Sequence, residues 1–500
     1  MLTQAYDVSH DLHPGEVWIG GRWMPATGGR IPLVDPTTEQ LLGESVDAGP
    51  AAVESAVAAA RQAYDGGHWA RLPLAERAAV LERVLEAVVA NGERFAQLQT
   101  AQMGAPLTVS RALVQGAMRM FRAYAECAQG IGFTYLRRDA VGQSLVNLDP
   151  VGVVAIVIPW NGPLSSLVSK AVPALLMGCT VVLKPAPETP LEAGLFAELC
   201  RDAGLPDGVF NVVTGGAATG EALVTAAGVD KVSFTGSTTA GRRVGELCGR
   251  SFTRVSLELG GKSAGIVLPD ADLALTVPEL VNGNFFNTGQ ICVALSRVLL
   301  PASRYDEFLD ALCETGASRV VGDPRDPGTA IGPLVSSRQR DRVEASIAAG
   351  RASGARLVLG GGRPAGLDRG WFVEPTIFAE VDNRSVLARE EVFGPVMSVL
   401  RYQTQSEAVA LANDSAYGLH GAVFSADPAA ALAVARGVRS GSVAVNTANL
   451  TPATPYGGVK SSGIGREHGR EGLESFLEST SYVLPADLAD RYQAAGVVVA

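Results

Sequence analysis

Hydrophobic and polar positions follow two different periods in the first quarter of the chain. Residues 15–50 carry short apolar stretches separated by turn residues, as in E-V-W-I-G-G-R-W and I-P-L-V-D-P-T-T, and predict short strands. From residue 51 to 125, Ala, Leu, Arg and Glu recur with the 3.6-residue spacing of helices. Asn91-Gly92 and the segment 104–106 mark turns between these helices.

From residue 151 onward, short apolar segments alternate with helical segments of roughly a dozen residues. This alternation is typical of βαβ units and a parallel sheet. The first series predicts strands at 151–158, 180–183, 209–213, 231–234 and 255–257. A second series begins at residue 264 and predicts a second α/β domain, with strands at 264–268, 296–300, 356–359 and 396–401.

Two further segments alternate as half-exposed strands do. Residues 131–150 read as a hairpin, and a similar pattern occupies residues 477–486. Exposed strands so far apart in sequence can pair with each other or extend the sheet of a partner. Both arrangements are compatible with the pattern.

Composition narrows the class of protein. The 500 residues are 47% hydrophobic and 18% charged, which is typical of a globular protein with two to four domains. The 41 basic and 51 acidic residues give a net charge of -10, which disfavours nucleic acid and anionic lipid as partners. Apolar runs fall short of the about 20 residues of a membrane span, and the N-terminal segment lacks a signal-peptide pattern. We expect a cytoplasmic protein without a membrane partner.

The cysteines indicate a reduced compartment and no metal site. Among the six cysteines there is no C-x-x-C pair, and no histidine lies nearby at metal-ligand spacing. Most free cysteines are inert buried residues. Cys292 differs, because it ends the segment F-F-N-T-G-Q-I-C, in which Gly289 allows close backbone approach and the neighbouring side chains are polar. This segment predicts a reactive thiol.

Two other positions suit the chemistry that a reactive thiol needs. Glu258 ends an apolar strand before two glycines, and partial desolvation there raises a carboxyl pKa toward that of a general base. Asn161 lies in the proline-stiffened turn P-W-N-G-P and suits an oxyanion donor. The simpler alternatives are a capping or ion-paired carboxylate and an ordinary turn asparagine.

Phosphate-binding signals are present, but not in their usual form. Ser256 replaces the glycine that a phosphate loop ending at Lys262 requires, and no G-x-G-x-x-G follows the early strands. Lys184 ends a predicted strand, where ligands bind in open α/β sheets. The segment F-T-G-S-T-T-A-G at 234–241 opens a helix that can attract phosphate. A solvated lysine and a plain capped turn are the alternatives.

The order of the motifs carries more information than any one of them. P-W-N, K-P-x-x-x-T-P, F-T-G-S-T-x-x-G, E-L-G-G-K-S, G-Q-x-C, E-x-F-G-P and P-Y-G-G-x-K-x-S-G-x-G-R-E follow one another between about residues 15 and 485. This series resembles the aldehyde dehydrogenase superfamily. The resemblance implies an α/β fold with a Rossmann-type cofactor domain, a second α/β catalytic domain and a small β oligomerisation arm. We expect the cofactor domain at 1–130 and 151–260, the catalytic domain at 261–465 and the arm at 131–150 and 466–500.

The resemblance also implies roles for single residues. Cys292 is then the nucleophile, Glu258 the general base, and Asn161 the oxyanion donor together with the backbone N–H of Cys292. The aldehyde becomes a thiohemiacetal and a thioester, which water activated by Glu258 releases as the acid. Lys170 and Glu478 match a proton relay. The cofactor contacts implied are Ile158, Pro159, Trp160, Lys184, Gly220, Phe234, Gly236, Ser237, Leu259, Glu391 and Phe393.

Two departures from the family pattern bear on specificity. Pro187 stands where many NAD-preferring members carry a glutamate that binds the adenosine ribose, so we expect NAD with NADP use possible. Gly162 follows P-W-N where relatives often have an aromatic residue. We expect a wide, neutral tunnel for a bulky apolar aldehyde, aromatic or terpenoid, lined by Gly162, Ser166, Ser169, Ile291, Val293 and Tyr456.

Two alternatives to a hydrolytic dehydrogenase remain. A CoA-acylating semialdehyde dehydrogenase commonly lacks the glutamate of E-L-G-G, and a non-catalytic structural relative would lack a catalytic residue. Cys292, Glu258 and Asn161 are all present, which favours the hydrolytic enzyme. The resemblance also implies a homo-oligomer, a tetramer or a dimer, whose other partner is the small-molecule aldehyde.

Overall fold

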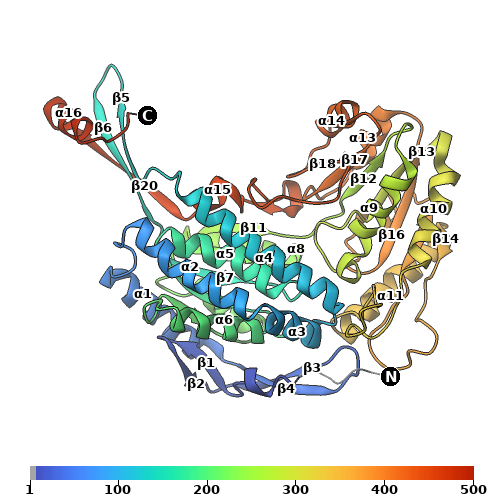
Figure 1. Cartoon of the computed structure of the whole chain (residues 1–500), viewed down its shortest axis with the longest axis horizontal. Helices are drawn as coiled ribbons and strands as arrows, with labels where there is room; N and C mark the ends of the chain where they lie inside the picture. Colours follow the sequence, from blue (N-terminus) through green and yellow to red (C-terminus); the bar gives the residue numbers. More distant parts are fainter. Residues whose placement is uncertain (1–6, 500) are drawn as a thin grey trace.

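Two twisted sheets covered by helices account for most of residues 7–499, the part of the chain that the computed structural model describes (Figure 1). A third, smaller sheet projects from the first body as an arm. None of the helices in this part of the chain has the length and apolar character needed to cross a membrane. The architecture confirms the predicted combination of two α/β bodies and a small β arm.

The first sheet has eight strands in the order β19-β11-β10-β7-β8-β9-β1-β2. Its five central strands are parallel and lie within two residues of the predicted positions: β7 (Val153–Val157), β8 (Thr180–Lys184), β9 (Phe210–Val212), β10 (Lys231–Thr235) and β11 (Arg254–Glu258). Antiparallel strands flank them: β1 (Glu16–Ile19), β2 (Arg22–Pro25) and β19 (Gly463–Ile464). A two-stranded ribbon lies nearby, formed by β3 (Gly29–Val34) and β4 (Leu41–Asp47).

Alternation along the strands separates two helical layers around this sheet. On β7, Val154 and Ile156 face one core, whereas Val153 and Ala155 face the other. The first layer contains α2 (Leu74–Ala90), α3 (Gly92–Met103), α4 (Leu107–Ala128), α5 (Pro163–Leu176) and α6 (Leu191–Asp202). The second layer contains α1 (Gly49–Gly66), α7 (Ala217–Thr225) and α8 (Thr238–Ser251).

The second sheet has seven strands in the order β14-β15-β16-β13-β12-β17-β18. Its bounds are β12 (Ala264–Val267), β13 (Arg297–Pro301), β14 (Arg356–Leu359), β15 (Thr376–Ala379), β16 (Val396–Tyr402), β17 (Gly421–Phe424) and β18 (Ala444–Val445). β15, β17 and β18 were not predicted, although β15 and β17 are as long as the predicted β12 and β14. The helices of this body are α9 (Leu273–Phe285), α10 (Tyr305–Ala317), α11 (Ser337–Ala352), α12 (Val386–Arg389), α13 (Gln405–Asn413) and α14 (Pro428–Ala435).

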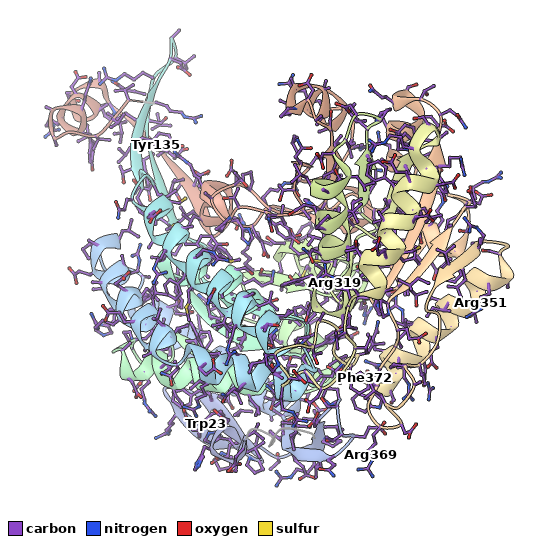
Figure 2. The ribbon with its side chains drawn as sticks, turned by 45° about the vertical axis from the view of Figure 1, so that its right-hand side comes forward. Trp23, Tyr135, Arg319, Arg351, Arg369 and Phe372 are labelled. Carbon is purple, nitrogen blue, oxygen red and sulfur yellow. The ribbon has the colours of Figure 1, made fainter. Side chains whose placement is uncertain are left out.

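The arm is an antiparallel sheet of β5 (Thr134–Arg138), β6 (Gln143–Pro150) and β20 (Leu477–Leu484), in the order β20-β6-β5. The two half-exposed segments therefore pair with each other. The C-terminal helix α16 (Ala486–Ala494) packs against the arm through Ala489, which lies beside Leu136 and Leu145. Figure 2 shows Tyr135 on this projection, well separated from Arg351 on α11.

The course of the chain between the two bodies differs from the predicted boundaries. β19 pairs with β11, so the chain has already returned to the first sheet before residue 465. Leu473 of α15 (Gly469–Glu474) and the following Phe476 pack in the core of the first body, not in the arm. The arm thus begins near residue 477. Residues 463–464 pair at the carboxyl end of β11, and by Phe476 the chain has reached the amino end of β7, where the Phe476 carbonyl oxygen accepts from the N–H of Val151.

Candidate active site

The site lies where the order of the first sheet reverses. From β7 the chain continues outward through β8 and β9, and then returns to the other side of β7 with β10 and β11. Ligands of open α/β sheets bind at the carboxyl ends of the strands at such a switch point. Asn161 follows β7, Lys184 ends β8 and Glu258 ends β11, so the topology brings predicted residues to one edge.

The segment before Cys292 is a tight loop with left-handed backbone. Within the 3-10 turn Phe286–Gly289, φ is 54° at Asn287, 58° at Thr288 and 69° at Gly289. A Cβ atom on Gly289 would lie 2.2 Å from the carbonyl oxygen of Gly394. The close backbone approach predicted for Gly289 is therefore confirmed, and such strained backbone needs firm anchoring.

Side chains of the loop supply that anchoring. Asn287 Nδ2 donates to the carbonyl oxygen of Asn161 at 2.9 Å, and Gln290 Oε1 accepts from the N–H of Val335 at 3.1 Å. Thr288 Oγ1 accepts from the N–H of Gly332 at 3.1 Å. The polar residues around the thiol are thus buried structural contacts that fix the loop.

Asn161 lies directly against this loop. Its Nδ2 donates to the carbonyl oxygen of Gln290 at 2.9 Å, two residues before Cys292. The asparagine is half-buried and precedes α5, whose first residue is Pro163. The structure therefore brings the amide of Asn161 and the predicted nucleophile into one site, although about 130 residues separate them.

The Cys292 thiol is half-enclosed and contacts one phenol. Its Sγ lies 3.3 Å from Tyr456 Oη. Burial raises the pKa of Cys292 to about 11, the hydrogen bond with Tyr456 opposes that rise, and the charges of Glu391 and Glu258 add to it. The thiol is protonated at neutral pH in this arrangement, so a proton acceptor is needed to generate the thiolate.

Glu258 has the surroundings of such an acceptor. It is 3% exposed, and neither carboxylate oxygen has a hydrogen-bond partner among the described residues. Burial raises the pKa of Glu258 well above its usual value, and the Glu467 carboxylate raises it further, whereas Lys170 lowers it. Gly457 permits this packing, because its Cβ would lie 2.6 Å from Glu258 Oε1. The predicted desolvation of the carboxylate is confirmed.

The structure corrects the predicted relay partner. Lys170 is fully buried on α5, where its Nζ pairs with Glu467 and lies 3.3 Å from Ser233 Oγ. Glu478 lies instead on β20 and pairs with Arg254 at the surface. Pairing of β20 with β6 carries Glu478 into the arm, away from Lys170. Glu467 was missed although it ends the motif G-x-G-R-E.

Tyr456, one of the residues predicted for the substrate pocket, belongs to a cluster of three aromatic residues. His468 stacks on Tyr456 with ring centroids 5.0 Å apart and meets Tyr124 edge-on at 6.2 Å. Tyr124 Oη donates to the carbonyl oxygen of Ser169 at 2.8 Å. Sequence reasoning missed Tyr124 and His468, because neither lies in a motif of the pocket. Ile291 and Val293 are half-buried on either side of Cys292.

The predicted pocket serines make local contacts. Ser169 is buried, and its hydroxyl donates to the carbonyl oxygen of Ser166 at 3.0 Å within α5. Ser166 is half-buried and Gly162 is buried at the start of the helix. Ser169 therefore presents a satisfied hydroxyl and not a free polar group. A small residue at position 162 leaves this end of the helix without a bulky side chain.

The adenosine side of the predicted cofactor site centres on Lys184. The lysine is 4% exposed, and its ammonium donates to the carbonyl oxygen of Pro185 at 2.8 Å. Burial lowers the pKa of Lys184 to about 8. An ammonium has three donors, so Lys184 retains capacity for a ligand. Gly220 leaves room beside it, since a Cβ there would meet the lysine stem at 3.4 Å.

The predicted phosphate side of the cofactor site is the N-terminus of α8. Ser237 caps the helix by accepting from the N–H of Ala240 at 3.2 Å and is itself exposed. Gly236 precedes the cap, where a Cβ would lie 2.6 Å from the ring of Phe234. Free N–H groups at a helix start attract phosphate. This combination of helix start, glycine and buried lysine fits a dinucleotide.

Glu391 and two aromatic rings lie at the predicted nicotinamide end of the cofactor site. Glu391 Oε1 accepts from the N–H of Gly261 at 2.9 Å, and burial raises the pKa of Glu391 to about 7. Trp160 and Phe393 meet edge to face at 5.3 Å. The remaining predicted contacts directly follow the carboxyl ends of β7 and β11; they are Ile158, Pro159 and Leu259.

Comparisons with known proteins agree with this geometry. A family model described as "Aldehyde dehydrogenase family" matches residues 23–482. The chain is 44% identical to geranial dehydrogenase of Castellaniella defragrans over 94% of this chain and 98% of that protein. It superimposes with a TM-score of 0.93 on a Mycobacterium tuberculosis aldehyde dehydrogenase complexed with NAD+, at 44% identity, with 94% and 98% of the two chains covered. It also superimposes with a TM-score of 0.92 on aldehyde dehydrogenase C of Pseudomonas syringae, complexed with NAD+ and octanal. The two are 39% identical, and the match covers 97% of this chain and 99% of that one.

Proposed function

The chain belongs to the aldehyde dehydrogenase family, and we propose that it oxidises a bulky apolar aldehyde to the carboxylic acid with NAD as the acceptor. The observation that carries this proposal is the convergence of three groups. The Cys292 thiol lies in a loop that is hydrogen-bonded to Asn161, and the desolvated carboxylate of Glu258 stands at the end of β11.

NAD is the cofactor that these residues suit. When bound, NAD supplies the acceptor for the hydride of the aldehyde carbon. Lys184 and the start of α8 at Ser237 would hold its adenosine and phosphate groups, and Glu391 with Phe393 would lie at its nicotinamide ribose. Pro187 offers the adenosine ribose no side-chain acceptor, so we include NADP as a weaker alternative.

The first chemical task of the chain is attack on the carbonyl. The Cys292 thiolate adds to the aldehyde carbon, and the carbonyl oxygen becomes an oxyanion. The Asn161 amide and the backbone N–H of Cys292 donate to that oxygen. One such donor typically stabilises the transition state by about 2.7–4 kcal/mol.

The second task is release of the acid from the thioester on Cys292. Glu258 takes a proton from water as the water oxygen attacks the thioester carbon; the C–S bond then breaks, and the acid leaves with Cys292 as the thiolate. Lys170 and Glu467 act on the pKa of Glu258 in opposite directions: the Lys170 ammonium lowers it and the Glu467 carboxylate raises it. We propose these two residues as the proton relay, with Glu467 in the place first assigned to Glu478.

The substrate class follows from the walls of the site. The ring of Tyr456, stacked on His468, and the aliphatic side chains of Ile291 and Val293 offer apolar surface next to the thiol. The similarity to a geranial dehydrogenase and to an enzyme complexed with octanal supports an aldehyde of this kind. Because Gly162 has no side chain, the start of α5 leaves more space, which favours a bulky aldehyde.

Reduced cofactor formation with an aldehyde panel tests the proposal. We expect a higher kcat/KM for geranial, octanal and benzaldehyde than for acetaldehyde, and higher activity with NAD than with NADP. Cys292→Ala is expected to abolish dehydrogenase activity. A preference for acetaldehyde would contradict the substrate class, and full activity of Cys292→Ala would contradict the mechanism. Formation of acyl-CoA instead of acid would support the acylating alternative.

We further propose that the arm mediates a homo-oligomer, a dimer or a tetramer. β6 lies between β5 and β20, so one backbone edge of β20 remains without a strand partner among the described residues. Tyr482 and Val483 on β20 are 47% and 81% exposed. An exposed strand edge with apolar side chains favours pairing with another chain.

A further inference from the structure

The contact between Tyr456 and Cys292 has no role in the mechanism above. Tyr456 Oη lies 3.3 Å from Cys292 Sγ, within the distance of a hydrogen bond to sulfur. Among the side chains of residues 7–499, Tyr456 is the one hydrogen-bonded to this sulfur. Both residues are half-buried, and Tyr456 belongs to the loop after β18, far in sequence from the nucleophile.

The position of the Tyr456 ring is fixed by its own loop. The backbone of Tyr456 exchanges two hydrogen bonds of 2.7 Å with Glu467. The ring stacks on His468 with a centroid distance of 5.0 Å and an interplanar angle of 25°. The next residue, Gly457, packs against Glu258. The adjacent residues Tyr456 and Gly457 therefore contact the predicted nucleophile Cys292 and the predicted base Glu258, respectively.

A phenol next to a thiol can donate or accept, whereas a thiolate only accepts. Burial, together with the charges of Cys292, Glu258 and Glu467, raises the pKa of Tyr456 well above its usual value, so the phenol is protonated at neutral pH. Hydrogen bonds to ionised acceptors are roughly twice as strong as neutral ones. The contact consequently favours the ionised sulfur over the neutral thiol.

We propose that Tyr456 is a positioning residue that donates a hydrogen bond to the Cys292 thiolate, holding Sγ in place and increasing the fraction of ionised nucleophile. On ionisation the thiol proton passes to water or to a nearby base, and the O–H bond of Tyr456 stays intact. No other covalent bond changes. The proposal deepens the proposed function, because it concerns the same nucleophile.

The charged groups around this contact oppose ionisation of Cys292, whereas the hydrogen bond from Tyr456 favours it. Glu258 and Glu391 face Cys292 and raise its pKa. Glu467 and Glu258 face Tyr456, and burial lowers the pKa of His468 to about 4, so the stacked imidazole is neutral. No cation among these neighbours stabilises the thiolate, which leaves the Tyr456 hydroxyl as the favourable side-chain contact.

Alkylation of Cys292 tests the proposal without any turnover. The full-length protein and Tyr456→Phe are treated with iodoacetamide across a neutral to alkaline pH series, and the Cys292 peptide is quantified by mass spectrometry. Phe keeps the ring and its stacking on His468 but removes the donor. We expect Cys292 alkylation in Tyr456→Phe to be about 10- to 100-fold slower at each pH, because the thiol pKa rises when the charge-assisted hydrogen bond is lost.

Tyr402→Phe is the matched control. Tyr402 Oη donates to the carbonyl oxygen of Val267 at 2.6 Å in the same body but does not contact Cys292, so its loss changes packing and not the thiol. We expect its Cys292 profile to match that of the original protein, with thermal melting comparable to that of Tyr456→Phe. An unchanged profile in Tyr456→Phe, or an equal rise in both variants, would overturn the proposal. If the Cys292 thiol pKa rises in Tyr456→Phe as expected but the original protein oxidises no aldehyde, only the proposed function would be overturned.

Discussion

At the scale of single residues, the site is governed by buried groups of opposite charge. Glu258, Lys170 and Glu467 meet beside the end of β11, and one lysine faces two carboxyl groups there. Two like charges in a desolvated site cannot both ionise without cost. Burial first, and the Glu467 charge second, therefore raise the pKa of Glu258 despite the neighbouring ammonium.

The raised pKa of Glu258 predicts a pH-dependent stability. A carboxyl group whose pKa rises on folding binds its proton more tightly in the native state, so stability falls as pH rises from its unfolded pKa through its folded pKa. We expect Glu258→Gln to melt at a higher temperature than the original protein at alkaline pH, and the difference to shrink on acidification. Calorimetric melts at several pH values measure this.

Glu221→Gln is the control with the opposite sign. Glu221 is exposed on α7, and the hydrogen bond from Arg243 lowers its pKa. Its replacement therefore removes a favourable interaction that is present at alkaline pH and lost on acidification. A melting difference for Glu258→Gln that stays constant with pH would contradict the prediction.

A second prediction separates Glu467 from Glu478. Glu467→Gln leaves the fully buried Lys170 without its counter-charge, and breaking a buried pair in this way costs about 3–5 kcal/mol. Glu478→Gln breaks a partly exposed pair with Arg254, for which at most about 1 kcal/mol is expected. Urea unfolding measures both. Equal losses in the two variants would show that Lys170 is not paired as described.

At the scale of elements, the site depends on loops that press against each other. The nucleophile loop meets the loop before β16 at Gly289 and Gly394, while Asn287 ties it to the turn after β7. The two sheets are thus joined at the point where the thiol lies. Small changes in this contact move the nucleophile relative to Asn161.

Gly289→Ala tests the contact between the loops. The new Cβ would lie 2.2 Å from the Gly394 carbonyl oxygen at a φ of 69°, so the loop must shift. A displacement of about 1 Å at a reacting group can cost roughly 100-fold in rate, and we expect a loss of kcat of that order. Gly354→Ala is the control, because its φ is 85° but nothing lies within 4 Å of a Cβ there. Comparable activity of the two variants would contradict the prediction.

At the scale of the whole molecule, the arm is the feature that the rest of the chain does not cover. It projects from the first body and carries the C-terminal helix α16 (Figure 1). The N–H of Leu136 on β5 donates to the carbonyl oxygen of Val498, so the C-terminal segment occupies the edge opposite β20. Among the described residues, the β20 edge of this sheet is the one without a backbone partner.

Val483→Asp tests assembly through β20. A charge at this 81% exposed position opposes burial in an interface, and we expect a smaller assembly by light scattering coupled to size exclusion. Val320→Asp is the control, at a 56% exposed position in the second body. An unchanged mass for Val483→Asp would exclude β20 from the interface.

Much of the fold could be predicted because the strands of the first sheet are buried on both faces. Such strands appear as short apolar runs bounded by turns, and β7, β8, β9, β10 and β11 all have this form. β15, β17 and β18 were missed, although β15 and β17 are as long as the predicted β12 and β14, and β18 is a strand of two residues. The second sheet was therefore predicted only in part.

The sequence by itself determined the alternation of strands and helices, the family resemblance, and Cys292, Glu258 and Asn161 as candidates, because each depends on local pattern and local chemistry. Only the tertiary structure decided which acid meets Lys170, since Glu467 and Glu478 are close to each other in sequence and both far from Lys170, but diverge where β20 enters the arm. It also decided that Tyr456 meets Cys292. Such contacts depend on the packing of segments far apart in the chain, which no local period encodes.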